Sequence, residues 1–199
     1  MARHAGALGL EPPTGPLPGA ARRPRAARAK ALIGEASRRA WGSKRRADGY
    51  DRGTGADPDS PKARAGRALQ AYVDDFEAIP VVILVGAVPW RVTDVTAGAS
   101  IYPACQNLLL AARALGYGGT MMMWHGLVEA DLRSLLAIPD EILLAATITL
   151  GVPEGRHGPL RRRPLPEVVY DDTWGAPATW AVDPPDTRFT SAGPRGAER

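Results

Sequence analysis

The feature that most constrains this chain is a helical pattern over residues 99–119 that is apolar on almost every side. The segment reads ASIYPACQNLLLAARALGYGG, and every residue from Leu108 to Ala112 is apolar. A helix that is apolar all round has to be covered all round. Because one sheet covers only one face, the second cover is either other helices of the same chain or a second copy of the chain.

Two amides, Gln106 and Asn107, stand within this apolar segment. A buried amide that lacks hydrogen-bond partners costs about 1–3 kcal/mol. Either a polar planar ligand or backbone groups would satisfy the two side chains. Periodicity alone leaves both alternatives open.

The pattern along the rest of the chain predicts helices that alternate with buried strands. Ser60 and Pro61 are typical of a helix start, and Gly116 is typical of a helix end. In the apolar helix, Ser100 is the expected cap and Pro103 is tolerated in the first turn. The expected helices cover residues 29–46, 61–78, 99–116 and 129–138, and the expected strands cover 79–88, 118–125 and 141–152. This order predicts an α+β or α/β fold, with helices packed on a sheet.

The two ends of the chain differ in composition from the middle. Residues 1–28 consist largely of Ala, Gly, Pro and Arg without periodicity, so we expect them to be disordered. Residues 29–175 carry the periodic pattern and are expected to form the folded domain. Residues 176–199 are rich in Pro and are expected to form a loose tail.

Charge and cysteine content narrow the classes of function. Residues 1–50 carry 11 Lys/Arg against 3 Asp/Glu, whereas the remaining residues carry 14 against 18. The basic charge therefore belongs to the N-terminal segment. This distribution argues against a nucleic-acid partner for the protein as a whole. The single cysteine, Cys105, argues against a disulfide framework or a Cys-rich metal site. No apolar run is long enough for a membrane span or a secretory signal, so a cytoplasmic protein is the simplest interpretation.

Several stretches taken together resemble the nitroreductase family. They are the apolar helix followed by TMMMWH, then VEADLRSLLAIPDEILLAATITLGVPEG, then RRRPLPEVVYDDTW. The resemblance runs from about Lys30 to Trp174. It implies a flavin-dependent oxidoreductase with a mixed sheet flanked by helices and a homodimer that binds FMN at the subunit interface. It also implies reduction of the flavin by NAD(P)H and a small-molecule acceptor such as a nitroaromatic or a quinone.

The resemblance assigns flavin contacts to three segments. The apolar helix matches the family segment that passes the flavin ring, and Gly119 to His125 matches the segment that lies over the ring. The basic stretch before Pro164 matches the family pair that holds the FMN phosphate, with Arg162 as the best match. The expected cofactor-binding residues are Ser100, Tyr102, Pro103, Gln106, Gly119, Thr120, Met121, Met122, Arg161, Arg162 and Arg163. No catalytic side chain and no metal ligand is assigned, and His125 is expected to be structural.

The resemblance also implies a C-terminal arm that crosses onto the partner subunit, with Trp174 as its anchor. The front of the chain departs from the family pattern, because neither the Arg-Ser-x-Arg motif nor the P-T/S-x-x-N-x-Q-x-W motif is intact. We therefore expect an N-terminally incomplete domain that binds FMN weakly. The alternative function is a non-catalytic remnant that acts at most as a dimerisation partner.

Overall fold

The computed structural model describes residues 24–55, 57–88, 97–154 and 162–187. The chain divides into two compact units, Met1–Pro153 and Glu154–Arg199. The helices and strands of the first unit follow one another in the order that the sequence predicts. The α+β fold class is confirmed.

The first two helices form an antiparallel pair. Helix α1 spans Pro24–Ala47 and helix α2 spans Pro61–Asp74. Ser60 caps α2 as predicted, because its hydroxyl accepts a hydrogen bond from the backbone N–H of Ala63 at 3.3 Å. α1 begins earlier than residue 29, since the Ala and Arg residues of PRAAR favour a helix and a proline is tolerated in its first turn.

The sheet contains three described strands, β1 (Val81–Ala87), β2 (Gly118–Met122) and β3 (Leu143–Gly151). Their order is β1-β3-β2, so β3 is central and both of its pairings are antiparallel. The parallel pairing that a mixed sheet requires is not found among the described residues. A register shift between Val85 and Gly86 bends the end of β1.

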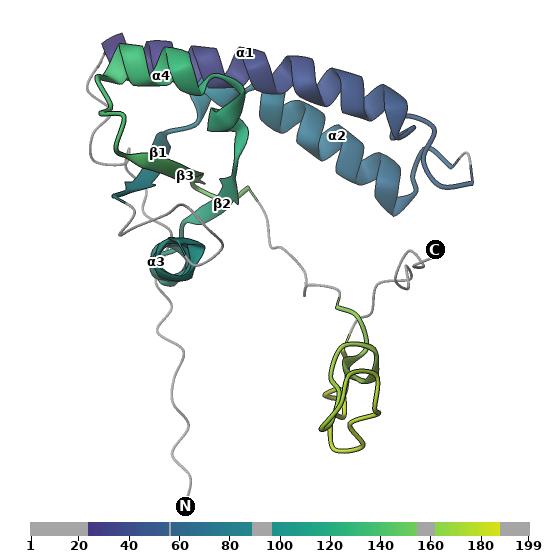
Figure 1. Cartoon of the computed structure of the whole chain (residues 1–199). Helices are drawn as coiled ribbons and strands as arrows, with labels where there is room; N and C mark the ends of the chain where they lie inside the picture. Colours follow the sequence, from purple (N-terminus) through teal and green to yellow (C-terminus); the bar gives the residue numbers. More distant parts are fainter. Residues whose placement is uncertain (1–23, 56, 89–96, 155–161, 188–199) are drawn as a thin grey trace, which may run out of the picture. The chain divides into compact units, whose positions relative to one another are not determined.

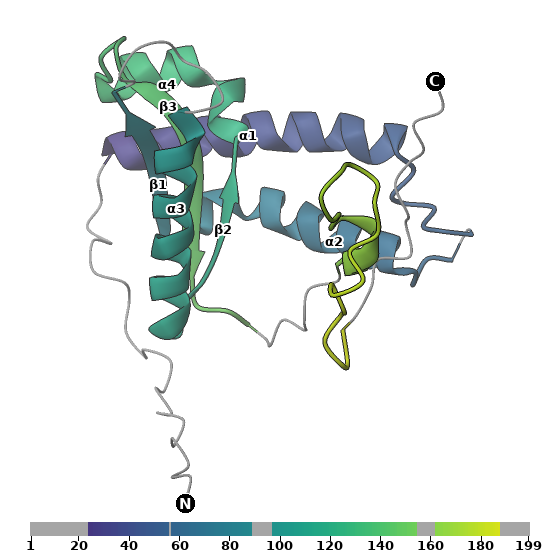
Figure 2. The ribbon, with the colours of Figure 1, turned by 60° about the horizontal axis from the view of Figure 1, so that its bottom comes forward.

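Helices cover the two faces of this sheet unequally. Helix α3 (Ala97–Ala114) lies alone against one face, as Figures 1 and 2 show. Helices α1 and α4 (Glu129–Leu136) lie against the other face, together with the short helices η1 (Phe76–Ala78) and η2 (Trp124–Leu127). The core on the α3 side centres on Ile101, Cys105, Ala145, Ala146 and Ile148. The core on the other side centres on Ala29, Ile33, Phe76 and Leu132.

Helix α3 is buried along one stripe only. Ile101, Cys105 and Ala112 are buried, whereas the side chain of Leu110 is 56% exposed. The described elements of the chain therefore do not cover the helix on all sides, in contrast to the alternative in which other helices of the same chain complete its cover.

The predicted ends of α3 are partly wrong. The helix begins at Ala97, so Ser100 lies inside the first turn and does not cap it. Pro103 consequently lies in the second turn, in the interior of the helix. The predicted end is confirmed, because Gly116 follows the helix with a φ of 86°, which a glycine adopts without strain.

The central strand carries two buried threonines that face the α1 side. Thr147 Oγ1 lies 3.0 Å from Nδ1 of His125, and Thr149 Oγ1 lies 2.8 Å from the hydroxyl of Tyr72. His125 is 4% exposed, and its Nε2 lies 3.3 Å from the carbonyl oxygen of Leu144. The ring joins η2 to the sheet, which agrees with the structural role expected for His125.

The second unit is short and irregular. It contains the short helix η3 (Leu165–Glu167), and the backbone N–H of Leu165 donates to the carboxylate of Asp183 at 3.1 Å. The rings of Trp174 and Tyr170 contact each other at a tilt of 55°, with 5.0 Å between centroids, and Trp174 is 92% exposed. No helix in the described part of the chain is long and apolar enough to cross a membrane.

Candidate functional site

The candidate site is one flank of α3 together with the neighbouring edge strand β2. Helical spacing places Tyr102 and Gln106 on the same side of α3 as Leu109, because residues three and four apart are neighbours on a helix. Leu109 contacts β2 at Gly119. The structure therefore brings Tyr102, Gln106 and Gly119 to one side of the α3 layer.

Gly119 lies close to both α3 and the central strand β3. A Cβ atom at this position would stand 2.6 Å from Cδ2 of Leu150 and 2.9 Å from Cδ2 of Leu109. It would also stand 2.8 Å from the carbonyl oxygen of Thr149. The absence of a side chain is therefore explained by packing within the protein, which the sequence alone did not reveal.

Strand alternation divides the other predicted residues of β2 between two faces. Met121 is opposite Ile148 and so shares the α3 face, whereas Met122 is opposite Thr147 and faces α1 and α4. The sulfur of Met122 lies 3.9 Å from the Tyr72 hydroxyl, within the core of that layer. Thr120 points to the same face as Met122. A ring on the α3 face would therefore meet the side chain of Met121, and the side chains of Thr120 and Met122 would not reach it.

The α3 flank combines apolar surface with an amide that has no partner in the described part of the chain. Tyr102 and Met121 are 41% and 38% exposed. Gln106 is exposed, and among the described residues no hydrogen bond forms to its side chain. Such a surface offers a flat apolar contact with one side-chain donor and acceptor, which suits a planar heterocycle.

Ser100 and Pro103 lie elsewhere on the exposed surface of α3. Helical spacing turns Ser100 toward the side opposite Tyr102, and Pro103 faces away from the sheet, near Leu110. These two residues consequently do not line the flank beside β2. They share the outer surface of the helix with the exposed leucine.

The predicted phosphate-binding arginines lie in the second unit, apart from Arg161, which lies outside the described residues. Arg162 is exposed. Arg163 forms an ion pair with Glu167 at 3.3 Å and donates to the Glu167 carbonyl oxygen. Arg162 therefore keeps more of its donors for a ligand than Arg163 does.

The sequence did not reveal the two hydrogen bonds that the threonines of β3 form in the core. Burial raises the pKa of the Tyr72 phenol above its ordinary value, and the hydrogen bond with Thr149 opposes part of this rise. The period-two pattern of β3 contains the signal, since Thr147 and Thr149 share one face of an otherwise apolar strand. Their partners could not be identified, because both are distant in sequence.

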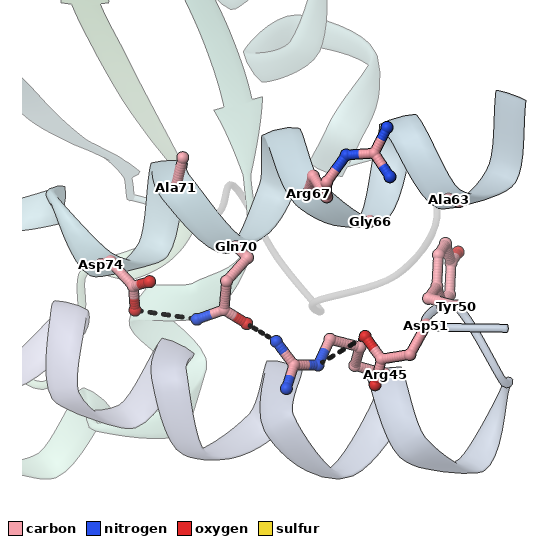
Figure 3. Close-up of a pocket in the computed structure, with 9 residues that line it drawn as sticks. All are labelled: Arg45, Tyr50, Asp51, Ala63, Gly66, Arg67, Gln70, Ala71 and Asp74. Atoms are coloured by element: carbon pink, nitrogen blue, oxygen red, sulfur yellow. Dashed lines mark hydrogen bonds and ion pairs between the residues drawn. The ribbon is translucent and has the colours of Figure 1, made fainter. Parts of the chain in front are cut away.

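A separate pocket of about 440 Å³ lies between α1 and α2, and Figure 3 shows its lining. A chain of polar contacts crosses it: Arg45 donates to Gln70 at 2.6 Å, and Gln70 donates to Asp74 at 2.8 Å. Arg45 also forms an ion pair with Asp51 at 3.3 Å. The polar groups that cross the pocket thus bind one another, and none of the predicted site residues lines it.

Within the described ranges, no cluster of three or more His, Cys, Asp or Glu side chains is placed to hold a metal ion. The candidate site is therefore built from α3 and β2, with an aromatic ring, a thioether and an amide.

A model of the nitroreductase family matches residues 22–152. The match begins earlier than Lys30, where the sequence resemblance was placed, and it ends before the basic stretch at 161–163. It includes every helix and strand of the first unit, among them α3 and β2. It leaves out the first residues of the chain. The match covers more than half of the length of the chain. The chain therefore belongs to the nitroreductase family.

Proposed function

We propose that this protein is an FMN-dependent oxidoreductase that passes a hydride equivalent from NAD(P)H, through the flavin, to a nitroaromatic, a quinone or a similar acceptor. Membership of the nitroreductase family indicates a flavin-dependent oxidoreductase. The observation that carries the finer proposal is the α3 flank, where Tyr102 and Met121 present an exposed apolar surface beside Gln106, whose amide has no hydrogen bond among the described residues.

The residues of this flank fit the ring of a flavin. The Gln106 amide can donate to or accept from the polar edge of the ring, and Tyr102 and Met121 supply apolar contact. The outer edge of β2 adds backbone groups that no described strand pairs. The flavin supplies the redox chemistry when bound, and these groups orient it and set its electrostatic surroundings.

We propose that the phosphate of FMN is bound by the basic stretch that contains Arg161, Arg162 and Arg163. Arginine combines positive charge with forked donors, which match a phosphate. Of the two arginines that the structure describes, Arg162 has more donors available for a phosphate, because Arg163 is engaged by Glu167. Each charge-assisted contact of this kind contributes about 1.5–3 kcal/mol.

We also propose that the protein works as a homodimer whose interface includes the outer surface of α3. Leu110 is 56% exposed there, and Leu115, in the turn after the helix, is 60% exposed. Full burial of one such side chain contributes about 1.5–3 kcal/mol. A second copy would bury this surface by the same contacts on both sides, as a two-fold interface does. The exposed Trp174 is a candidate anchor of the C-terminal arm on the partner.

Titration of the purified full chain with FMN tests the proposal. Since the two N-terminal motifs that contact the flavin in the family are not intact, we expect FMN to be lost during purification and to rebind when added. NAD(P)H oxidation with a nitroaromatic or a quinone is then expected only in the presence of FMN.

The matched variants for this assay are Gln106→Ala and Asn107→Ala, which remove neighbouring exposed amides from different sides of α3. We expect Gln106→Ala to weaken FMN binding about tenfold, the equivalent of one hydrogen bond to a polar ring, and Asn107→Ala to have little effect. Absence of both FMN binding and NAD(P)H oxidation at millimolar FMN would contradict the proposal. It would favour the alternative of a non-catalytic dimerisation partner.

A further inference from the structure

The pocket between α1 and α2 has a wall of small residues on its α2 side, formed by Ala63, Gly66 and Ala71. A Cβ atom at Gly66 would stand 3.1 Å from Cβ of Tyr50, so Tyr50 packs directly against this wall. The pocket volume of about 440 Å³ lies within the range of about 300–1,000 Å³ that is typical of small-molecule sites. The pocket is therefore large enough for a small organic ligand, and no residue of the proposed flavin surface lines it.

Arg45 lines this pocket with one edge of its guanidinium group incompletely satisfied. Its Nη1 donates to the Gln70 amide oxygen at 2.6 Å, as Figure 3 shows. Its Nε is buried, but in the described part of the chain no acceptor forms a hydrogen bond with it, and Nη2 donates to no described residue. A buried donor that lacks an acceptor is destabilising. Nε and Nη2 form one edge of the guanidinium, and such an edge binds the two oxygens of a carboxylate.

The carboxylate at this edge belongs to Asp51, in the turn that follows α1. Its Oδ1 lies 3.3 Å from Nε of Arg45, within ion-pair distance but without the alignment of a hydrogen bond. The Asp51 side chain is 61% exposed, so the pair is solvated and contributes little to stability. Asp51 therefore marks a carboxylate position without satisfying it, and another carboxylate can replace it at small cost.

We propose that the pocket binds a small aromatic carboxylate, whose two oxygens accept hydrogen bonds from Nε and Nη2 of Arg45 in place of Asp51. The ring of the ligand lies against the Tyr50 ring and the small residues of α2. Aromatic rings favour such contacts with one another. Trp41 is buried and meets Tyr50 edge to face at 4.9 Å between ring centroids, which holds the Tyr50 ring in position.

The charges of the lining favour a monoanion over a phosphate. Arg67 also lines the pocket, but it is paired with Asp59 at 3.2 Å, so Arg45 supplies the guanidinium edge for a ligand. Asp51 and Asp74 line the pocket as well, and both repel an anion. This repulsion grows with the charge of the ligand, so a doubly charged phosphate is disfavoured more than a carboxylate. An inorganic ion would also leave the apolar wall without contacts.

Titration of the full chain with benzoate, followed by NMR, tests the proposal at the Nε–H group of Arg45. The Nε–H signal is assigned by its loss in Arg45→Lys, and we expect it to shift as benzoate is added to the wild type. Arg45→Lys keeps the charge but removes the forked edge, and it is expected to weaken benzoate binding about tenfold. Asp51→Asn removes the competing carboxylate and is expected to tighten binding about threefold.

The matched controls are Arg39→Lys and Glu35→Gln, which alter an exposed ion pair on the same helix. Both are expected to leave benzoate binding unchanged. Benzamide has the shape of benzoate without its charge, and we expect it to bind about tenfold more weakly. Inorganic phosphate is expected to leave the Nε–H signal of Arg45 where it is.

Three results would overturn the proposal. The first is an Nε–H signal of Arg45 that does not move during the titration. The second is equal benzoate affinity in the wild type, Arg45→Lys and Asp51→Asn, which would place the carboxylate elsewhere. The third is an equal shift with phosphate, which would favour a general anion site. If circular dichroism shows that Arg45→Lys does not fold, the Asp51→Asn comparison still decides, because the Asp51 side chain is exposed.

Discussion

The two helix layers of the first unit differ in how completely the chain covers them. α1 buries Ile33 and Trp41, and Arg38 fastens it to Glu77 through two hydrogen bonds of 2.9 and 2.7 Å. α3 buries one stripe, exposes Leu110 on its outer surface and exposes the Gln106 amide on the flank beside β2. The first layer is therefore stabilised within the chain, whereas the outer surface of the second is available for association and binding. Substitutions in the two layers should act on different equilibria.

The largest expected difference is between two leucines of similar size. Leu132 is fully buried in the α1 layer, and Leu132→Ala is expected to lower the free energy of unfolding by about 2–5 kcal/mol. Leu110→Ala removes the same atoms from an exposed position and is expected to change the unfolding of the monomer by no more than about 0.5 kcal/mol. Urea denaturation at low protein concentration measures both. Equal losses would show that α3 is covered as completely as α1.

The second test concerns association. Leu110→Glu places a charge on the outer surface of α3 in both copies of the proposed dimer, and we expect the dissociation constant to rise about 100-fold or more. Analytical ultracentrifugation across a dilution series provides the measurement, and circular dichroism checks that the monomer remains folded. Ala104→Glu adds the same single charge at an exposed position on another side of α3 and serves as the control. An unchanged dissociation constant for Leu110→Glu would place the interface elsewhere.

The third test concerns the buried phenol of Tyr72, which belongs to the complete layer. Tyr72→Phe removes one hydrogen bond to Thr149 and is expected to cost about 1 kcal/mol at neutral pH. Burial raises the pKa of Tyr72 in the folded protein. The neutral phenol therefore contributes to the free energy of unfolding below the ordinary phenol value near 10, and this contribution is lost as the pH rises through the raised value. Urea titrations at neutral and alkaline pH should therefore show that the variant loses less free energy of unfolding at alkaline pH than the wild type does. If both proteins lose the same free energy of unfolding at alkaline pH, groups other than Tyr72 cause the loss.

The smallest effect is expected for the ion pair that joins α1 to η1. The hydrogen bond from Arg38 lowers the pKa of the Glu77 carboxyl, so the pair stabilises the fold above the ordinary carboxyl value and is lost as the pH falls through the lowered value. The Glu77 side chain is 38% exposed, which limits the effect of Glu77→Gln to about 0.5–1 kcal/mol at neutral pH. Thermal unfolding should show this difference at pH 7 and no difference in acid. Glu35→Gln, on an exposed pair within α1, is the control.

Much of the fold could be predicted from the sequence, because its elements are marked by local signals. The Ser60 cap, the Gly116 end and the apolar runs that became β1 and β3 all depend on residues close in sequence. The start of α3 could not be predicted in this way, because Ser100 has cap chemistry although the helix already exists three residues earlier. Local pattern identifies an element more securely than its first residue.

The candidate site was predictable only in part. Resemblance assigned flavin contacts to residues of α3 and β2 and treated Thr120, Met121 and Met122 as a group, whereas strand alternation separates Met121 from its two neighbours. The buried partners of Thr147 and Thr149 come from distant segments and left no local signal. The assignments of Ser100, Tyr102, Pro103, Gln106, Gly119 and the arginines to flavin contacts remain predictions for the binding assays above.

Gly119 has a consequence for anyone who alters the protein. The gap between β2, β3 and α3 at this position has no tolerance, because even a methyl group would stand 2.6 Å from Leu150 and 2.8 Å from a backbone oxygen. A larger residue would displace the β3 backbone at Thr149 and the side chains of Leu109 and Leu150, and Leu109 lies on the same side of α3 as Tyr102 and Gln106. The geometry of the proposed flavin surface is therefore sensitive to Gly119, a position that is exposed but presents no side chain to that surface.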